Sequence, residues 1–230
     1  MTARAVSSLG AACVLAVSVL GSPAAAQQRV AVDRVAAVVG AGSFSTRVLE
    51  SDVELRAYAR RLRERAANAL VAPLVDADRA AALEDLIGEA LIAREAGRVR
   101  LPVPSRADVA RERVRIVDGM GGESAVQSLL RHLGASAREI DATAERRALV
   151  GAFLRANLEG STEVSDAELA RAYARGEHPF VDRPLEDARE PLRAWLRQRA
   201  VDRVVARWIG VLETRLFLQV IAPYSPRSKR

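Results

Sequence analysis

The stretch 82–104 constrains this chain most, because a helical apolar pattern and a stop signal coincide in it. Gly97 is suited to a left-handed C-terminal cap, and Pro102 and Pro104 prevent further helix. The pattern predicts a helix of about 20 residues, roughly 30 Å long, whose apolar face other parts of the chain must cover. The apolar residues that recur at helical spacing on this face are Leu83, Leu86, Ile87, Ala90 and Leu91.

The first residues predict a signal peptide rather than part of the fold. Arg4 precedes an apolar run over 11–20 that is too short to span a bilayer, and an A-x-A site ends at Ala26. We expect cleavage after Ala26, export, and a periplasmic location in a cell with two membranes. A lipoprotein signal at Cys13 is disfavoured, because Gly10 stands where such signals carry Leu. Cleavage removes the only cysteine, and no later apolar run is long enough for stable membrane insertion.

Most of the mature chain is predicted to be helical. Four Ser-x-x-acid capping boxes precede apolar stripes and each predicts a helix start. A glycine-rich segment, 119–122, separates two of the shorter helices, and a long helix through Pro191 should be kinked or divided there. The predicted helices cover 51–72, 105–117, 126–133, 136–158, 165–175 and 185–212, besides the one in 82–104.

Two segments predict strands. Val35–Val39 is β-branched and is followed by glycines, which is typical of a hairpin, and 216–221 is a nearly continuous apolar run, which predicts a buried strand. The fold class expected is therefore mainly α: an irregular multi-helix domain with a small antiparallel sheet formed by an N-terminal hairpin and a C-terminal strand. A disordered basic tail is expected over 223–230. The predicted structural core comprises Leu83, Leu86, Ile87, Leu91, Phe153, Trp195 and Trp208.

The search for catalytic or metal-binding patterns predicts none. His132 and His178 lack a second ligand at helical spacing, and no nucleophile elbow or phosphate-binding glycine motif occurs. We therefore expect no catalytic residue, no cofactor and no metal. The net charge of +6 comes from dispersed arginines, which does not favour nucleic acid as a partner. Met120, in the glycine-rich segment, is a candidate contact for bound polypeptide.

The order of elements resembles the SurA family of periplasmic chaperones and peptidyl-prolyl isomerases. VDRVAAVVGAGSFSTRVLESDVELR, ALEDLIGEALIAREAGRVRLPVPSRADV and FLRANL are similar to that family's N-terminal chaperone domain. LEDAREPLRAWLRQRAVDRVVARWIGVLETRLFLQVI looks like its closing helix and strand. The resemblance implies the ranges 27–158 for the chaperone domain, 159–184 for a short helix and linker, and 185–222 for the closing segment.

The resemblance also implies a function, and the chain differs from the family in one respect. Family members carry parvulin-type isomerase domains where this chain has only 159–183, so we expect no enzymatic activity. The expected function is that of an ATP-independent holdase for unfolded polypeptides, in particular outer-membrane protein precursors. Two alternatives stay open: a peptidyl-prolyl cis-trans isomerase, and a structural adaptor whose apolar faces are covered by a fixed partner or a second copy.

Overall fold

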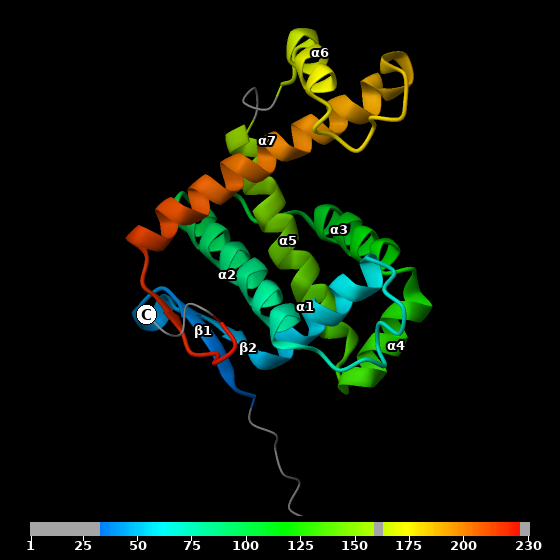
Figure 1. Ribbon diagram of the computed structural model, residues 1–230. Coiled ribbons are helices and arrows are strands. Elements are labelled where there is room, and N and C mark those ends of the chain that lie inside the picture. The colour runs from blue at the N-terminus through cyan, green and yellow to red at the C-terminus, as the bar shows by residue number, and fades with distance from the viewer. Residues whose placement is uncertain (1–32, 159–162, 226–230) are drawn as a thin grey trace, which may run out of the picture. The chain divides into compact units, whose positions relative to one another are not determined.

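A three-stranded antiparallel sheet joins the two ends of the chain that the structure describes (Figure 1). The structure is a computed structural model and describes residues 33–158 and 163–225. β1 (Val35–Val39) lies between β2 (Thr46–Leu49) and β3 (Leu218–Val220), with Val39 opposite Thr46 on one side and Leu218 on the other. The predicted sheet of an N-terminal hairpin and a C-terminal strand is thereby confirmed.

β3 is not the buried strand that its sequence predicted. Phe217 and Ile221 flank it and are 54% and 49% exposed, while Leu218 and Val220 are half-buried. β3 is an edge strand, and successive side chains of a strand point to opposite faces, so one face of the apolar run remains in contact with solvent. The fully buried part of the sheet is β1, where Ala36, Ala37 and Val39 have no exposed surface.

Seven α-helices make up most of the described residues, so the mainly helical class is confirmed (Figure 1). All described residues belong to one compact unit, and no helix among them is long and apolar enough to cross a membrane. A 3₁₀ helix occupies Gly42–Phe44 in the hairpin turn. The α-helices are α1 (Glu50–Arg63), α2 (Asp76–Arg98), α3 (Arg106–Gly119), α4 (Glu123–Leu133), α5 (Ala137–Leu158), α6 (Asp166–Arg175) and α7 (Leu185–Arg215).

α2 is the helix predicted within 82–104, and its true bounds differ at both ends. It begins at Asp76, where the Asp78 carboxylate accepts the backbone N–H of Val75 at 3.4 Å in the place of a Ser or Thr cap. It ends at Arg98, and Arg100, not Gly97, takes the left-handed conformation after it, with φ 54°. The cap predicted at Gly97 is wrong, because that residue is still helical.

Serine caps were predicted correctly at three of four helices. Ser105, Ser136 and Ser165 each pair with the acid three residues on, at 2.9–3.1 Å from the serine N–H to the carboxylate. α1 instead begins at Glu50, with Asp52 accepting the N–H of Leu49 at 3.2 Å. The box predicted at Ser51 is wrong, because the Ser51 hydroxyl is already paired with Asp33.

α1 is also shorter than its pattern predicted. It ends at Arg63, and the chain from there to Pro73 contains turns but no further helix. Arg65 and Asn68 adopt left-handed conformations, with φ 51° and 57°. Such residues interrupt helical hydrogen bonding, so Ala66, Ala69 and Leu70, which the apolar pattern places in the helix, form a loop instead.

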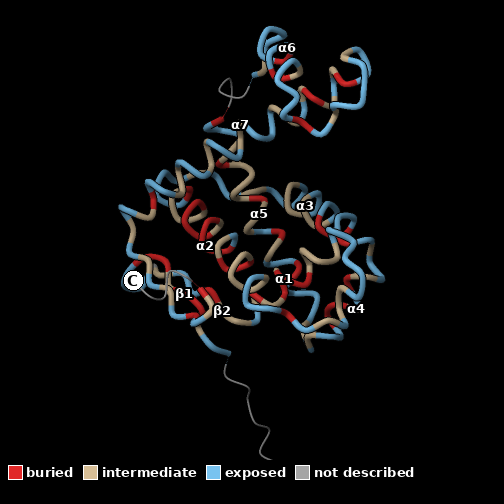
Figure 2. The backbone as a smooth tube through the Cα atoms, viewed as in Figure 1, coloured by how far each residue is buried: buried red, intermediate tan, exposed pale blue. Residues whose placement is uncertain are grey.

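The main core surrounds α2, as Figure 2 shows in red. Trp208 is half-buried and packs edge-on against Phe153, with ring centroids 5.6 Å apart. Trp195 does not belong to the core: it is half-exposed, and the Arg199 guanidinium lies 4.8 Å above its ring. The predicted core residues that are confirmed as buried are Leu83, Leu86, Ile87, Leu91 and Phe153.

A second, smaller set of buried residues lies where α6 meets the start of α7. It lies outside the main core, and Asp166 of α6 pairs with Arg189 and Arg193 of α7 beside it. α7 runs through Pro191 as one helix, so this proline does not begin a separate segment. The second cluster comprises Leu169, Ala172, Ala188 and Leu192.

The C-terminal segment is anchored beyond β3. Ser225 is 1% exposed, and the Tyr224 hydroxyl donates to Glu50 at 2.8 Å, so the tail predicted from 223 does not begin there. The expected signal peptide, 1–26, and the rest of the expected tail, 226–230, lie outside the described residues.

Candidate functional site

Four helices border a partly open cavity of about 160 Å³ that is lined by apolar and arginine side chains. We call it the arginine cavity. α1, α3 and α5 contribute the charged residues, and α2 contributes Leu86. Its apolar residues are Leu55, Ala59, Leu86, Ile116, Met120 and Ile140, and its polar residues are Asp52, Arg56, Arg63, Glu112, Arg115, Thr143, Arg146 and Arg147.

Met120 contributes to this cavity rather than to an open surface. Its side chain is 3% exposed, because the residue closes α3 and packs within the main core. Gly121 and Gly122, with φ near 96°, then reverse the chain into α4. The glycine-rich sequence indicated an exposed residue, but the tertiary packing buries Met120 in the cavity wall. Its role as a contact for bound polypeptide stays a prediction.

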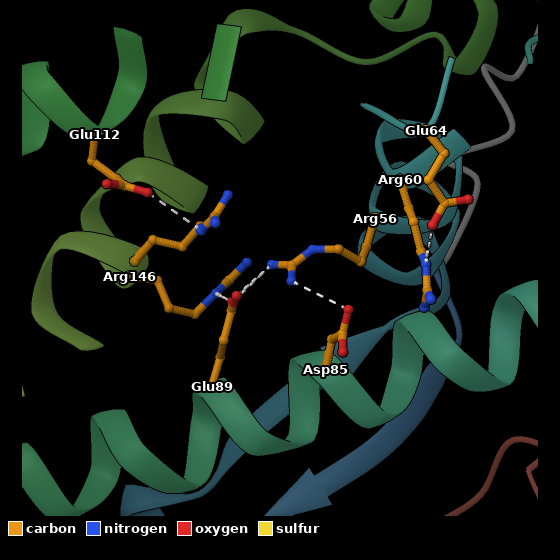
Figure 3. Close-up of polar contacts among 8 residues, drawn as sticks. Arg56, Arg60, Glu64, Asp85, Glu89, Glu112 and Arg146 are labelled. Atoms are coloured by element: carbon orange, nitrogen blue, oxygen red, sulfur yellow. Dashed lines mark hydrogen bonds and ion pairs between the residues drawn. The ribbon is translucent and has the colours of Figure 1, made fainter. Parts of the chain in front are cut away.

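Glu89 of α2 forms ion pairs with two arginines of the cavity, Arg56 and Arg146 (Figure 3). Arg56 Nη2 donates to both carboxylate oxygens at 2.8 Å, and Arg146 Nε donates to Oε2 at 3.3 Å. Asp85 lies 4.0 Å from the other Arg56 nitrogen. The side chains of Arg56 and Glu89 are only 10% and 14% exposed, so this pair is shielded from solvent far more than an ordinary surface ion pair.

Glu112 holds two further arginines. Arg115 Nη1 lies 2.9 Å from Oε2 and Arg147 Nε lies 3.4 Å from Oε1. Five arginines thus line the cavity against two carboxylates, Asp52 and Glu112. Guanidinium groups keep their charge at any physiological pH, so the cavity has an excess of positive charge.

Arg63 makes no ion pair with another described residue. Although the residue as a whole is exposed, partial loss of water around its guanidinium lowers its pKa, and repulsion from Arg147 and Arg56 lowers it further. The aliphatic part of its side chain approaches Gly119, where an added Cβ would lie 3.6 Å from Arg63 Cδ. The aliphatic part of Arg63 thus packs near Gly119, while its charged group lines the cavity without an ion-pair partner among the described residues.

A second feature is the middle of α7, residues 195–204, which we call the α7 midsection. Its apolar side chains, Trp195, Leu196, Val201 and Val204, are all half-buried, and none packs against the main core. Only three of the 31 residues of α7 are buried. The helix therefore carries more apolar surface than its own fold covers.

The incomplete burial of the α7 midsection has a geometric cause. Ala188 and Leu192 face the second cluster, whereas Val205, Trp208 and Leu212 pack on the main core. Leu192 and Val201 are nine positions apart, which at about 100° per residue places them on opposite sides of the helix. The buried face changes between the two halves, so both apolar stripes end in the midsection without full cover.

The histidines have structural surroundings. The His132 and Tyr58 rings pack in a T-shaped arrangement, with ring centroids 4.8 Å apart. His178 is buried, its Nδ1 accepts the N–H of Phe180 at 3.1 Å, and its Nε2 lies 3.3 Å from the carbonyl oxygen of Tyr173. Among the described residues, no group of three His, Cys, Asp or Glu side chains is placed to hold a metal ion.

Comparison with known proteins adds no relative: neither a family model nor a curated protein matches the chain. The likeness to the SurA family therefore rests on the order and pattern of the elements alone.

Sequence reasoning did not find the arginine cavity. A signal was present in α1, where Arg56 and Arg63 are seven residues apart and so share one face with the apolar Ala59. Arginines are common on solvated faces in this chain, so that spacing alone did not separate these two from the rest.

Proposed function

We propose that the mature protein is an ATP-independent periplasmic chaperone that holds unfolded polypeptides, with the α7 midsection as its contact surface. The observation that carries the proposal is the incompletely buried apolar set in this segment, Trp195, Leu196, Val201 and Val204. An uncovered apolar surface on a folded protein is typical of a binding site for apolar polypeptide segments. The predicted signal peptide and the resemblance to the SurA family support unfolded outer-membrane protein precursors as clients.

The chemistry of the midsection favours weak and adaptable binding. Trp195 offers a large flat surface with the exposed Arg199 above its ring, and Arg197 and Arg203 are further exposed positive charges on this segment. Aromatic and arginine side chains are enriched at contact surfaces because each combines apolar area with polar groups. Such a surface binds many sequences without requiring one register, as a holdase must.

The proposal is tested by the aggregation of an unfolded β-barrel protein in the presence of the mature chain. We expect suppression by the wild type at stoichiometric excess and its loss in Trp195→Ala, with an unchanged free energy of unfolding. Val114→Ala is the matched control, because Val114 is an exposed apolar residue on α3, away from α7. Wild-type chain without effect would exclude the function, and full activity in Trp195→Ala would exclude this surface.

The same preparation separates the alternatives. A proline-limited refolding assay should show no acceleration above the uncatalysed rate, because no parvulin pattern occurs in the sequence. Light scattering after chromatography measures whether a second copy covers the α7 midsection. A tight dimer in which Trp195 is shielded from a fluorescence quencher would favour the adaptor over the holdase.

A further inference from the structure

We propose that the arginine cavity is a binding site for a small anion with an apolar group: a carboxylate attached to a ring or a branched chain of about the size of benzene. The inference does not rest on the holdase function, because the α7 midsection contributes no residue to this cavity. It rests on three properties of the cavity: its charge, its size and the position of Arg63.

The charge of the cavity requires an anion. Its four paired arginines share carboxylates, Arg56 and Arg146 on Glu89, and Arg115 and Arg147 on Glu112. Asp52 in the lining and Asp85 beside Arg56 bring the carboxylates to four against five arginines, so one positive charge, which corresponds to the unpaired Arg63, has no counter-charge among the described residues. Guanidinium groups match a planar carboxylate through two parallel N–H···O bonds.

The size and the walls of the cavity require an apolar group as well. Leu86, Ile116 and Ile140 form part of the lining and are themselves buried. A volume of about 160 Å³ is close to that of an apolar cavity of roughly 150 Å³ that takes up benzene. An inorganic anion would leave the apolar walls without contacts, and a neutral ring would leave the arginines without a counter-charge.

Arg63 is placed to complete the site. It lines the cavity, forms no ion pair with another described residue, and has a pKa that is lowered by desolvation and by Arg147 and Arg56. An anion within the cavity would offset both effects at once. The structure thus assigns Arg63 as the side chain that recognises the carboxylate, while the paired arginines supply the surrounding field.

Titration of the full mature chain with phenylacetate, followed by calorimetry and by amide NMR shifts, tests the assignment. We expect saturable binding that shifts signals of α1, α3 and α5, and at least tenfold weaker binding of neutral phenylacetamide and of sulfate. Arg63→Gln should weaken phenylacetate binding about tenfold, because it removes the charge but keeps the aliphatic contact with Gly119. Arg60→Gln is the matched control, since it removes the same charge from α1 outside the cavity.

A second variant tests the apolar part of the site. Ala59→Leu fills the lining without removing an arginine, so it should abolish phenylacetate binding and leave the circular dichroism spectrum unchanged. Sulfate that binds as tightly as phenylacetate, no saturable binding, or equal effects of Arg63→Gln and Arg60→Gln would each overturn the proposal.

Two sources can supply this chemistry, a free small acid or the C-terminal residue of a polypeptide. Acetylated tripeptides that end in Phe, as the free acid and as the amide, distinguish them. Tighter binding of the free-acid peptide than of phenylacetate identifies a chain end as the ligand, and weaker binding identifies a small acid. Equal binding of the peptide acid and its amide would contradict recognition of the carboxylate.

Discussion

At the scale of single residues, Glu89 connects three helices through ion pairs. It accepts hydrogen bonds from α1 through Arg56 and from α5 through Arg146, and it lies on α2 itself. Its carboxylate thus joins three helices at a point where solvent is largely excluded. Removing one partner of a shielded ion pair costs more than the pair contributes net, because a charge is left buried without compensation.

Glu89→Gln should therefore lower the free energy of unfolding by roughly 2 to 3 kcal/mol, since the Gln carbonyl keeps one hydrogen bond but not the charge. Chemical denaturation measures the loss. Glu64→Gln is the control, because Glu64 pairs with Arg60 on an exposed surface and should cost less than about 1 kcal/mol. Equal losses would show that Glu89 behaves as a surface residue.

Tyr224 provides a pH-dependent contact. Burial, and then the hydrogen bond to Glu50, raise the pKa of Tyr224 well above its ordinary value. The folded state thus favours the protonated phenol, so its contribution to stability is complete below the unfolded pKa of about 10 and is lost as pH rises above it.

Tyr224→Phe should cost about 1 kcal/mol at pH 8, where the hydrogen bond is intact in the wild type. Above about pH 10, the wild type should lose stability with pH faster than the variant does. Denaturation midpoints of both proteins at pH 8 and pH 11 check this. A difference that stays constant between the two values would contradict the raised pKa.

At the scale of elements, α2 and α7 approach each other closely at a glycine. A Cβ added at Gly88 would lie 2.8 Å from Cδ1 of Ile209, and Gly88 itself is buried. Glycine inside a helix costs about 1 kcal/mol relative to alanine, so its presence here trades helix propensity for close contact with α7. Neither helix alone shows this, because the two residues are far apart in the sequence.

A double-mutant cycle tests this contact. Gly88→Ala should raise the free energy of unfolding of the wild type little or not at all, because Ile209 must shift. The same substitution should stabilise Ile209→Val by about 1 kcal/mol. Unfolding free energies of the four proteins give the coupling. Gly97→Ala is the control for propensity alone, since no atom lies within 4 Å of a Cβ added there. A coupling near zero would show that the two helices have room for alanine.

Local signals predicted most helix starts and failed where a distant residue intervened. The Ser136 hydroxyl pairs with Glu139 and lowers the pKa of that carboxyl, as a capping box requires. Ser51 carries the same pattern, but Asp33 competes for its hydroxyl from 18 residues away. A capping box is a short-range interaction, so sequence predicts it unless a long-range partner is present.

At the scale of the whole molecule, the sheet ties the C-terminal segment to the N-terminal hairpin. β1 is hydrogen-bonded on both edges, Gly40 N–H donates to Phe217 O at 2.7 Å, and the N–H groups of Ile221 and Ala222 donate to Ala36 O at 2.8 and 3.0 Å. These bonds join residues 36–40 to residues 217–222, close to the two ends of the described chain. The strand order β2-β1-β3 is set by the pairing between strands, and neither end of the chain determines it alone.

Truncation after Leu216 should lower stability by several kcal/mol, because β1 loses one set of partners and Ala222, which is buried, leaves the core. Hydrogen exchange should show lost protection over Val35–Val39. Truncation after Ser225 is the control, because it keeps β3, Ala222 and Tyr224. Equal protection of β1 in the two truncated proteins would contradict a closing role for β3.

The sequence by itself determined the fold class, most helix positions, three serine caps and the positions of β1 and β3, because periodicity and capping depend on residues close together in the chain. Only the tertiary structure decided that Met120 is buried, that Trp195 is not, and that arginines gather around one cavity. The decisive contacts join residues far apart: 33 positions for Arg56 and Glu89, 57 for Glu89 and Arg146, and 174 for Glu50 and Tyr224. No local pattern encodes such pairs, since they exist only after the helices have packed.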